Sequence, residues 1–209
     1  MNMQEYGNQA SKTVLIQPVD DHDLALIESE VAAICETTDD FRLIAVKVND
    51  WNKDLSPWDA PPVFGSERFG NGADGFLKEI LSLCTDRSKI YFIGGYSLAG
   101  LFALWAAYQT DTFAGVAAAS PSIWFPRFTD YMRKYPIRLR RVYLSLGDRE
   151  ERTRNPVLAT VGTRITEAHG LLRAQGVDCV FEWNPGNHFQ DPDKRTAKAF
   201  ARLLSDGTM

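Results

Sequence analysis

Cysteine and histidine are both scarce in this sequence, with three of each in 209 residues. The cysteines Cys35, Cys84 and Cys179 are widely separated, show no CxxC spacing and have no histidine nearby. An odd number of isolated cysteines does not suit a disulfide framework or a zinc site. The sequence therefore predicts reduced, structural thiols and no metal site.

Long hydrophobic runs and an excess of positive charge are also missing. No stretch approaches the ~20 apolar residues of a membrane helix, and the polar N-terminus MNMQEYGNQASK lacks the apolar segment of a signal peptide. Lys plus Arg number 23 and Asp plus Glu 27, a formal net charge of −4. This acidity excludes a basic nucleic-acid binder. We expect a cytoplasmic protein with neither nucleic acid nor membrane as partner.

What the sequence has is a regular alternation of short apolar runs and helical periodicity. The runs predict strands at Thr13–Gln17, Phe41–Val48, Ile90–Gly94, Phe113–Ala119, Arg141–Leu146 and Val177–Trp183. Helices are predicted from Asp23 to Ile34, over Gly75–Cys84, from Ser97 to Tyr108, from Asn155 to Gly176, and from Asp191 to Leu204. Continuously apolar strands are typical of a parallel sheet covered by helices on both faces. The prediction is a single α/β domain over residues 1–209 with a sheet of about six strands, preceded by a poorly ordered tail at residues 1–11.

Ser97 is the predicted nucleophile. It lies in GGYSLAG, residues 94–100, between a predicted strand and a predicted helix. A serine on such a turn needs small residues two positions before and after it, and Gly95 and Ala99 meet that need. The turn also directs the N–H of Leu98 toward a developing oxyanion. An ordinary capping serine in a glycine-rich turn is the alternative.

His188 is the predicted base, because a serine hydroxyl needs one to become a nucleophile. It lies in the loop NPGNHF between the last predicted strand and the last predicted helix, at the same edge of the sheet as Ser97. His169 falls inside a predicted helix beside its apolar stripe, and His22 falls at the start of the first helix. Structural roles are expected for both.

An acid should orient the imidazole, and the fifth predicted strand ends in LGDREE, residues 146–151. Serine, acid and histidine then follow the chain order of α/β-hydrolases. A position three residues after the strand-ending glycine favours Glu150, while Asp148 is shorter and nearer to the strand. Both stay open as the acid.

The second oxyanion donor should come from the loop after the first predicted strand. Pro18 has no N–H, which leaves Val19 or Asp20, and Val19 is the predicted donor.

Two aromatic segments are candidates for the substrate-binding wall. Residues 49–74 show no clear periodicity, which is unusual for so long a segment of a compact domain. Trp51, Asp54 and Trp58 are its predicted substrate contacts, and the alternative is a rigid loop whose tryptophans pack on the body. In residues 121–136, Trp124 either walls the pocket or packs.

The motifs GYSLAG, LGDREE and NPGNHF resemble those of the α/β-hydrolase superfamily, specifically its esterase-D-like esterases, related to enterochelin esterases and S-formylglutathione hydrolases. The resemblance extends from Thr13 to Leu204. It implies a minimal α/β-hydrolase fold, a triad of Ser97, an acid and His188, and hydrolysis of small-molecule carboxylic esters or thioesters without metal or cofactor. The usual first two strands are expected to be missing or vestigial, and no large cap follows the fourth predicted strand.

Two other functions are compatible with the same residues. The triad could pass the acyl group to an alcohol or amine, as an acyltransferase does. A non-catalytic binding module on a hydrolase scaffold is the second alternative, although it has no need of serine, acid and histidine together.

Overall fold

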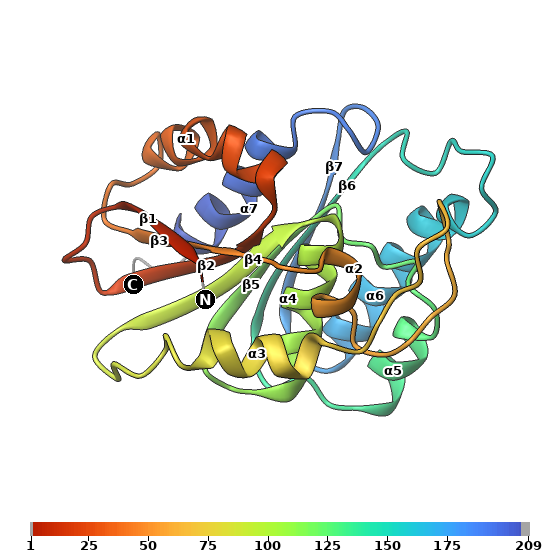
Figure 1. Ribbon diagram of the computed structural model, residues 1–209, viewed down its shortest axis with the longest axis horizontal. Coiled ribbons are helices and arrows are strands. Elements are labelled where there is room, and N and C mark those ends of the chain that lie inside the picture. Colours follow the sequence, from red (N-terminus) through yellow and green to blue (C-terminus); the bar gives the residue numbers. More distant parts are fainter. Residues whose placement is uncertain (1, 206–209) are drawn as a thin grey trace.

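A single mostly parallel sheet forms the centre of the protein (Figure 1). The computed structural model describes residues 2–205. Seven strands lie in the order β1-β3-β2-β4-β5-β6-β7. They are β1 (Met3–Gly7), β2 (Thr13–Val19), β3 (Arg42–Lys47), β4 (Ile90–Tyr96), β5 (Phe113–Ala119), β6 (Arg141–Gly147) and β7 (Asp178–Asn184). Neighbouring strands are parallel except for β1, which runs antiparallel to β3.

Six of these strands confirm the predicted ones, with bounds that differ by a few residues. The seventh, β1, corrects the prediction of a poorly ordered tail at residues 1–11. The segment MQEYG has no apolar run to identify it. Its stability comes from pairing with β3 and from an ion pair between Glu5 and Arg42 at 2.6 Å. These partners are distant in sequence, so the local sequence pattern does not predict this edge strand.

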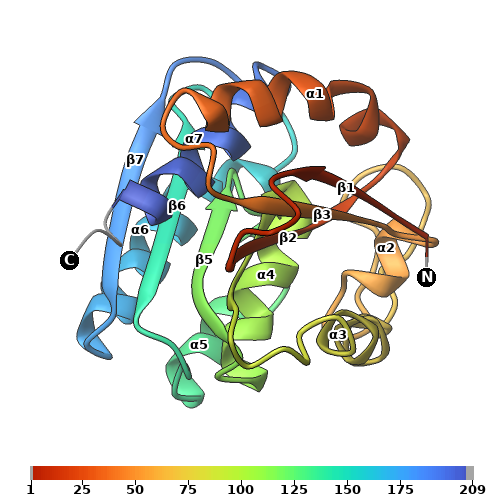
Figure 2. The ribbon, with the colours of Figure 1, turned by 90° about the vertical axis from the view of Figure 1, so that its left-hand side faces the viewer.

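Helices cover both faces of the sheet, as predicted (Figure 2). They are α1 (Asp21–Cys35), α2 (Trp51–Asp54), α3 (Ala73–Leu81), α4 (Ser97–Gln109), α5 (Phe128–Lys134), α6 (Val161–Ala174) and α7 (Pro192–Ser205), with a 3-10 turn η1 (Leu158–Thr160). Apolar side chains of α1 and α7, such as Ile27 and Phe200, pack on one face. Those of α3, α4 and α6, such as Leu77 and Ile165, pack on the other.

Helix α4 is the most deeply placed of these helices. Every residue from Leu98 to Tyr108 is buried, as expected for a helix that is apolar on all sides. Because this helix begins at Ser97, the predicted nucleophile is fixed to a rigid, central element.

Two helix starts differ from the prediction. The N-cap of α1 is Asp20 in place of Asp23, and the two residues form a reciprocal capping box. Helix α6 begins only at Val161, because Asn155 caps the preceding turn by accepting from the N–H groups of Val157 and Leu158.

Two further expectations concern the cysteines and membrane-spanning helices. Cys35, Cys84 and Cys179 are all free. Within residues 2–205, no helix has the length and apolar character needed to cross a membrane.

Glu30 of α1 is a buried carboxyl with little support. It is 3 % exposed, and one of its oxygens accepts from Gln17 Nε2 at 3.2 Å. The other oxygen has no hydrogen-bond partner within residues 2–205. Burial raises the pKa of Glu30 well above its usual 4.5. The folded protein therefore binds this proton more tightly than the unfolded chain does, and the resulting stabilisation is lost as the pH rises above about 4.5.

Replacing this carboxyl by a neutral amide should stabilise the protein at neutral and alkaline pH. We expect Glu30→Gln to raise the free energy of unfolding by about 1 kcal/mol or more at pH 8, with the gain shrinking toward pH 4. Urea unfolding at both pH values measures it. The exposed Glu28→Gln on the same helix is the control and should change stability by less than about 0.5 kcal/mol. An equal effect of Glu30→Gln at the two pH values would contradict this account.

Candidate active site

Ser97 occupies a strained turn between β4 and α4. Its φ of 55° lies in the left-handed region that non-glycine residues rarely adopt. A Cβ added at Gly95 would lie 2.7 Å from the Cβ of Ala99, so the turn requires the small residues that the sequence analysis identified. Strain of this kind concentrates at functional sites.

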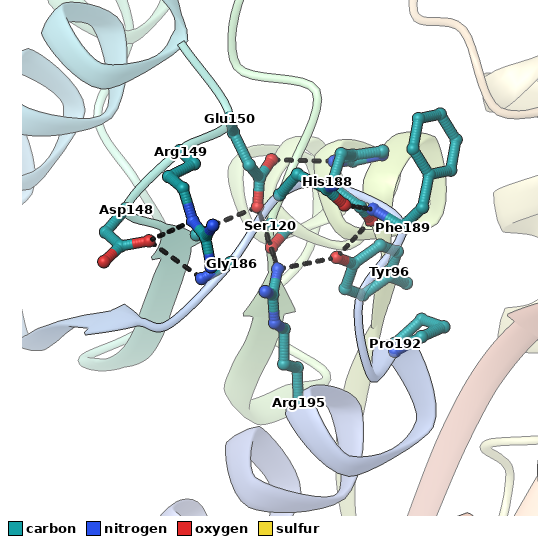
Figure 3. Close-up of polar contacts among 12 residues, drawn as sticks. Tyr96, Ser120, Asp148, Arg149, Glu150, Gly186, His188, Phe189, Pro192 and Arg195 are labelled. Atoms are coloured by element: carbon teal, nitrogen blue, oxygen red, sulfur yellow. Dashed lines mark hydrogen bonds and ion pairs between the residues drawn. The ribbon is translucent and has the colours of Figure 1, made fainter. Parts of the chain in front are cut away.

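Ser97, His188 and Glu150 form a continuous hydrogen-bonded series. Ser97 Oγ lies 3.0 Å from His188 Nε2, and His188 Nδ1 lies 2.7 Å from Glu150 Oε2. Figure 3 shows the imidazole of His188 turned toward the Glu150 carboxylate. Since a carboxylate only accepts, Nδ1 carries the imidazole proton and Nε2 is free to accept from the Ser97 hydroxyl.

Glu150 Oε1 faces the interior and is held there by three donors. It accepts from Ser120 Oγ and from the Gly147 N–H, each at 2.7 Å, and from the Arg195 guanidinium at 3.0 Å. The side chains of Glu150 and Arg195 are 3 % and 4 % exposed. A Cβ added at Gly147 would clash with the carbonyl oxygen of Gly186 and would lie 2.9 Å from Glu150 Oε1 and 3.0 Å from Arg195 Nη1. The glycine that ends β6 therefore makes room first for the backbone of the loop that contains Gly186 and then for this buried ion pair.

Asp148, the other candidate acid, has a different role. Its side chain is 55 % exposed, and its Oδ1 accepts from the Gly186 N–H at 2.8 Å. Within residues 2–205 it makes no hydrogen bond to His188. The turn after Gly147 directs Glu150 inward and Asp148 outward, so of the two open alternatives only Glu150 reaches the imidazole.

Arg195 of α7 also fixes the loop that carries His188. Its guanidinium donates to the Tyr96 hydroxyl at 3.0 Å and to the carbonyl of Pro185 at 2.8 Å. The Tyr96 hydroxyl donates in turn to the carbonyl of His188 at 2.8 Å (Figure 3). Burial, aided by the nearby Glu150 carboxylate, raises the pKa of Tyr96 to about 12, so its hydroxyl keeps the proton that it donates.

One of the two predicted oxyanion donors suits the geometry. Leu98 is in the first turn of α4, where backbone N–H groups have no acceptor within the helix. Val19 is not suitable. Its carbonyl accepts from Val48 N–H, and in an extended strand the N–H and C=O of one residue point to the same side. The Val19 N–H is therefore directed toward β3, away from β4 and Ser97. The Asp20 N–H donates to the Asp23 carboxylate at 3.2 Å.

A cavity of about 580 Å³ opens over Ser97 and His188. Most of its exposed wall surface is apolar, and its lining also includes two arginines and several polar side chains. The lining comprises Phe64, Trp124, Arg149, Arg152, Thr153, Leu158, Val161, Asn187 and Phe189, together with Ser97, Glu150 and His188. Phe189 and Phe64 are 88 % and 52 % exposed, which is unusual for such large apolar side chains.

Of the predicted substrate contacts, Trp124 lines this cavity, whereas Trp51, Asp54 and Trp58 do not. Trp58 donates its indole N–H to the carbonyl of Pro126 at 3.0 Å and stacks on Phe128. Trp51 packs against the core, and Asp54 accepts from the Asp50 N–H at the start of α2. The alternative of a rigid loop whose tryptophans pack on the body therefore describes this segment. Phe64 is its one cavity-lining residue within residues 2–205.

The two remaining histidines lie outside this arrangement. His169 Nε2 is 3.1 Å from the carbonyl of Cys179, between α6 and β7. His22 is exposed in the first turn of α1. In the described part of the chain, no three His, Cys, Asp or Glu side chains gather as a metal ion would require.

The chain was compared with protein-family models, with curated protein sequences and with solved structures. No family model and no curated protein sequence matches the chain. Esterase PE8 matches in structure with a TM-score of 0.61 at 16 % identity, over 98 % of this chain and 97 % of that protein. Zea mays acyl-protein thioesterase 2 matches with a TM-score of 0.61 at 13 % identity, over 98 % of both chains. The chain has an α/β-hydrolase fold.

A third match concerns a longer protein. The enterobactin esterase FES from Shigella flexneri, crystallised in the presence of 2,3-dihydroxy-N-benzoyl-glycine, matches with a TM-score of 0.65 at 12 % identity. The match covers 98 % of this chain and 55 % of the Shigella protein. At these identities the likeness concerns the α/β-hydrolase fold alone.

Sequence reasoning missed three residues of this candidate site. Ser120 and Arg195 hold the Glu150 carboxylate, and Ser122 Oγ lies 3.3 Å from Ser97 Oγ. The two serines belong to the stretch SPS directly after the fourth predicted strand, at the edge of the sheet where the site was expected. Their position directly after a predicted strand could have identified them as candidate site residues. For Arg195, inside a predicted amphipathic helix, there was no such signal.

Removing Arg195 should be far more costly than removing an exposed cation from the same helix. Arg195→Met leaves the Glu150 carboxylate buried without its cation, which typically costs about 3–5 kcal/mol. Lys198, which pairs with Glu182 nearer the surface, is the matched control, and Lys198→Met should cost less than about 1 kcal/mol. Urea unfolding of both variants tests this. Similar costs for the two would show that the buried pair does not stabilise the fold.

Proposed function

We propose that the protein is a serine esterase that cleaves carboxylic esters or thioesters of small molecules. The observation that supports this most strongly is the series from Ser97 Oγ through His188 to Glu150, with distances of 3.0 Å and 2.7 Å. It opens into a cavity with apolar walls. Its members follow the chain order of α/β-hydrolases. The names of the structural neighbours, an esterase, a thioesterase and an enterobactin esterase, agree with this proposal.

Acylation begins with transfer of the Ser97 hydroxyl proton to His188 Nε2 while Oγ forms a bond to the ester carbonyl carbon. The carbonyl π electrons move to oxygen, and the Leu98 N–H stabilises the resulting charge. The Glu150 carboxylate, 2.7 Å from Nδ1, stabilises the imidazolium. When the carbon–oxygen bond of the ester breaks, His188 gives its proton to the leaving alkoxide.

Deacylation repeats these steps with water in place of serine. His188 removes a proton from water, hydroxide oxygen bonds to the acyl carbon, and the Ser97–acyl bond breaks as the proton returns to Oγ. The free acid leaves and the resting enzyme is restored. Apart from the ester and water, acylation and deacylation use only Ser97, His188, Glu150 and the oxyanion donors.

The cavity walls indicate which part of the ester is recognised. Trp124 and Phe64 are in edge contact with ring centroids 5.9 Å apart, and Phe189, the residue after His188, also lines the cavity. These surfaces suit an apolar or aromatic group next to the scissile bond. The large exposure of Phe189 suggests an open site that accepts groups of different size.

The reaction is tested first at its nucleophile and base. Hydrolysis of p-nitrophenyl acetate and butyrate by the wild type should fall by about 10⁵-fold or more in kcat for Ser97→Ala and for His188→Ala. A fluorophosphonate should add one label to the wild type, on Ser97, located by mass spectrometry. Circular dichroism checks that the variants fold. A folded wild type that neither hydrolyses nor takes the label would refute the esterase.

The same assays separate the two acids. Glu150→Gln removes the charge that stabilises the imidazolium and should lower kcat by about 10³–10⁴-fold. Asp148→Asn is the matched control, because within residues 2–205 the Asp148 side chain accepts a hydrogen bond only from the Gly186 N–H and forms a surface ion pair with Arg149. It should retain activity within about threefold. The reverse pattern would assign the acid to Asp148.

Phe189 provides a test of the apolar wall. Phe189→Ala should raise KM for the butyrate ester about threefold to tenfold while kcat changes little, because the lost contact is apolar and remote from the developing charge. Trp183 is a suitable control, since it is 50 % exposed and lies outside the cavity. Trp183→Ala should leave KM unchanged. If Phe189→Ala also leaves KM unchanged across an ester panel, the substrate does not use this wall.

A further inference from the structure

Ser122 places a second hydroxyl group beside the nucleophile. It follows β5 in a tight turn, where Ser120 adopts a left-handed φ of 42° and Pro121 comes next. The Ser122 N–H donates to the carbonyl of Ser97 at 2.9 Å, and its Oγ lies 3.3 Å from Ser97 Oγ. Ser122 is 2 % exposed. Its position is therefore set by the backbone of the nucleophile turn itself.

The direction of the hydrogen bond between the two serines follows from their other partners. Ser97 has one hydroxyl proton, and this proton is directed to His188 Nε2, which can only accept while Nδ1 donates to Glu150. Ser97 Oγ is therefore the acceptor from Ser122. In the resting protein the Ser122 O–H points toward the atom that will react.

Of the three backbone N–H groups considered for the oxyanion, those of Leu98, Val19 and Asp20, one is suitable. The Leu98 N–H is available, but the Val19 N–H is directed toward β3 and the Asp20 N–H donates to Asp23. A single donor is fewer than the pair that hydrolases of this fold use. Among the described residues, the Ser122 hydroxyl is the remaining donor that forms a hydrogen bond with Ser97 Oγ.

We propose that the Ser122 hydroxyl is the second hydrogen-bond donor to the oxyanion, an inference that rests on the proposed serine esterase function. As Ser97 Oγ bonds to the carbonyl carbon, its proton passes to His188 and the π electrons move to the carbonyl oxygen. That oxygen is attached to the same carbon as Oγ. The Ser122 O–H transfers its hydrogen bond from Ser97 Oγ to this oxygen by rotation about Cβ–Oγ, and the proton remains bonded to Ser122 Oγ.

This arrangement favours the transition state over the bound ester. The donor is buried, and a hydrogen bond to a developing charge in such a site is much stronger than one to a neutral carbonyl. Removal of the donor should therefore lower kcat and leave KM nearly unchanged.

The test compares Ser122→Ala with the wild type on p-nitrophenyl butyrate. We expect kcat to fall about 10²–10³-fold, with KM within about threefold. Inhibition by butylboronic acid, whose adduct with Ser97 mimics the tetrahedral intermediate, should weaken by a similar factor. Ser56 is also buried and its hydroxyl has no partner within residues 2–205, so Ser56→Ala controls for loss of a buried hydroxyl and should leave both values unchanged.

A second pair of variants keeps the result interpretable if Ser122→Ala does not fold. The side chains introduced by Ser122→Thr and Ser122→Val have nearly the same shape, but only the first keeps a hydroxyl. The kcat of Ser122→Thr should therefore be at least about tenfold higher than that of Ser122→Val. Equal activity of this pair, or wild-type activity of a folded Ser122→Ala, would overturn the proposal while the esterase function stands. Failure of the wild type to hydrolyse esters and to label Ser97 would instead overturn the esterase function, and this inference with it.

Discussion

The site depends on one buried negative charge, the carboxylate of Glu150. It receives hydrogen bonds from His188, Arg195, Ser120 and the backbone of Gly147. These donors come from four separate segments that meet at the carboxyl ends of the strands. A carboxylate that is 3 % exposed is unfavourable unless it is paired and fully hydrogen-bonded. The same bonds that make its burial tolerable therefore set the position of His188 relative to Ser97.

Three of the four non-glycine residues with a left-handed φ within residues 2–205 lie in the segments around this charge; the fourth, Arg127, precedes α5. Ser97, Ser120 and Asp191 have φ values of 55°, 42° and 51°, and each begins or ends a segment that holds the site. Such conformations cost about 1–3 kcal/mol each and persist only where the surroundings impose them. Here the surroundings are buried strands and helix α4, in which all but the first and last residues are buried. The sheet thus holds in strained conformations the turn of Ser97, the turn whose Ser120 binds the buried carboxylate, and the loop that carries His188.

The sequence allowed prediction of the features that arise from local chemistry. The turn around Ser97 needs small residues because a Cβ at position 95 would clash with Ala99, four positions further along the chain. Six strands are likewise predicted from their local apolar runs. The choice between Asp148 and Glu150 was not local, because it depends on which side chain the turn directs inward to Arg195. That arginine is separated from its partner Tyr96 by 99 positions. Periodicity carries no information about such contacts, and Val19 was wrong for the same reason, since its N–H direction depends on pairing with β3.

The cavity and the chemistry are connected through the loop that bears His188. Phe189, the exposed wall of the cavity, is the next residue, and its N–H donates to Asn187 Oδ1 at 2.9 Å. The carbonyl of His188 accepts from Tyr96, which in turn accepts from the buried Arg195. Phe189 is therefore part of a segment tied to the same arginine that pairs with Glu150. Because this segment is held from the interior, contact with the exposed Phe189 ring would not displace the His188 imidazole, which is what the proposed open site requires.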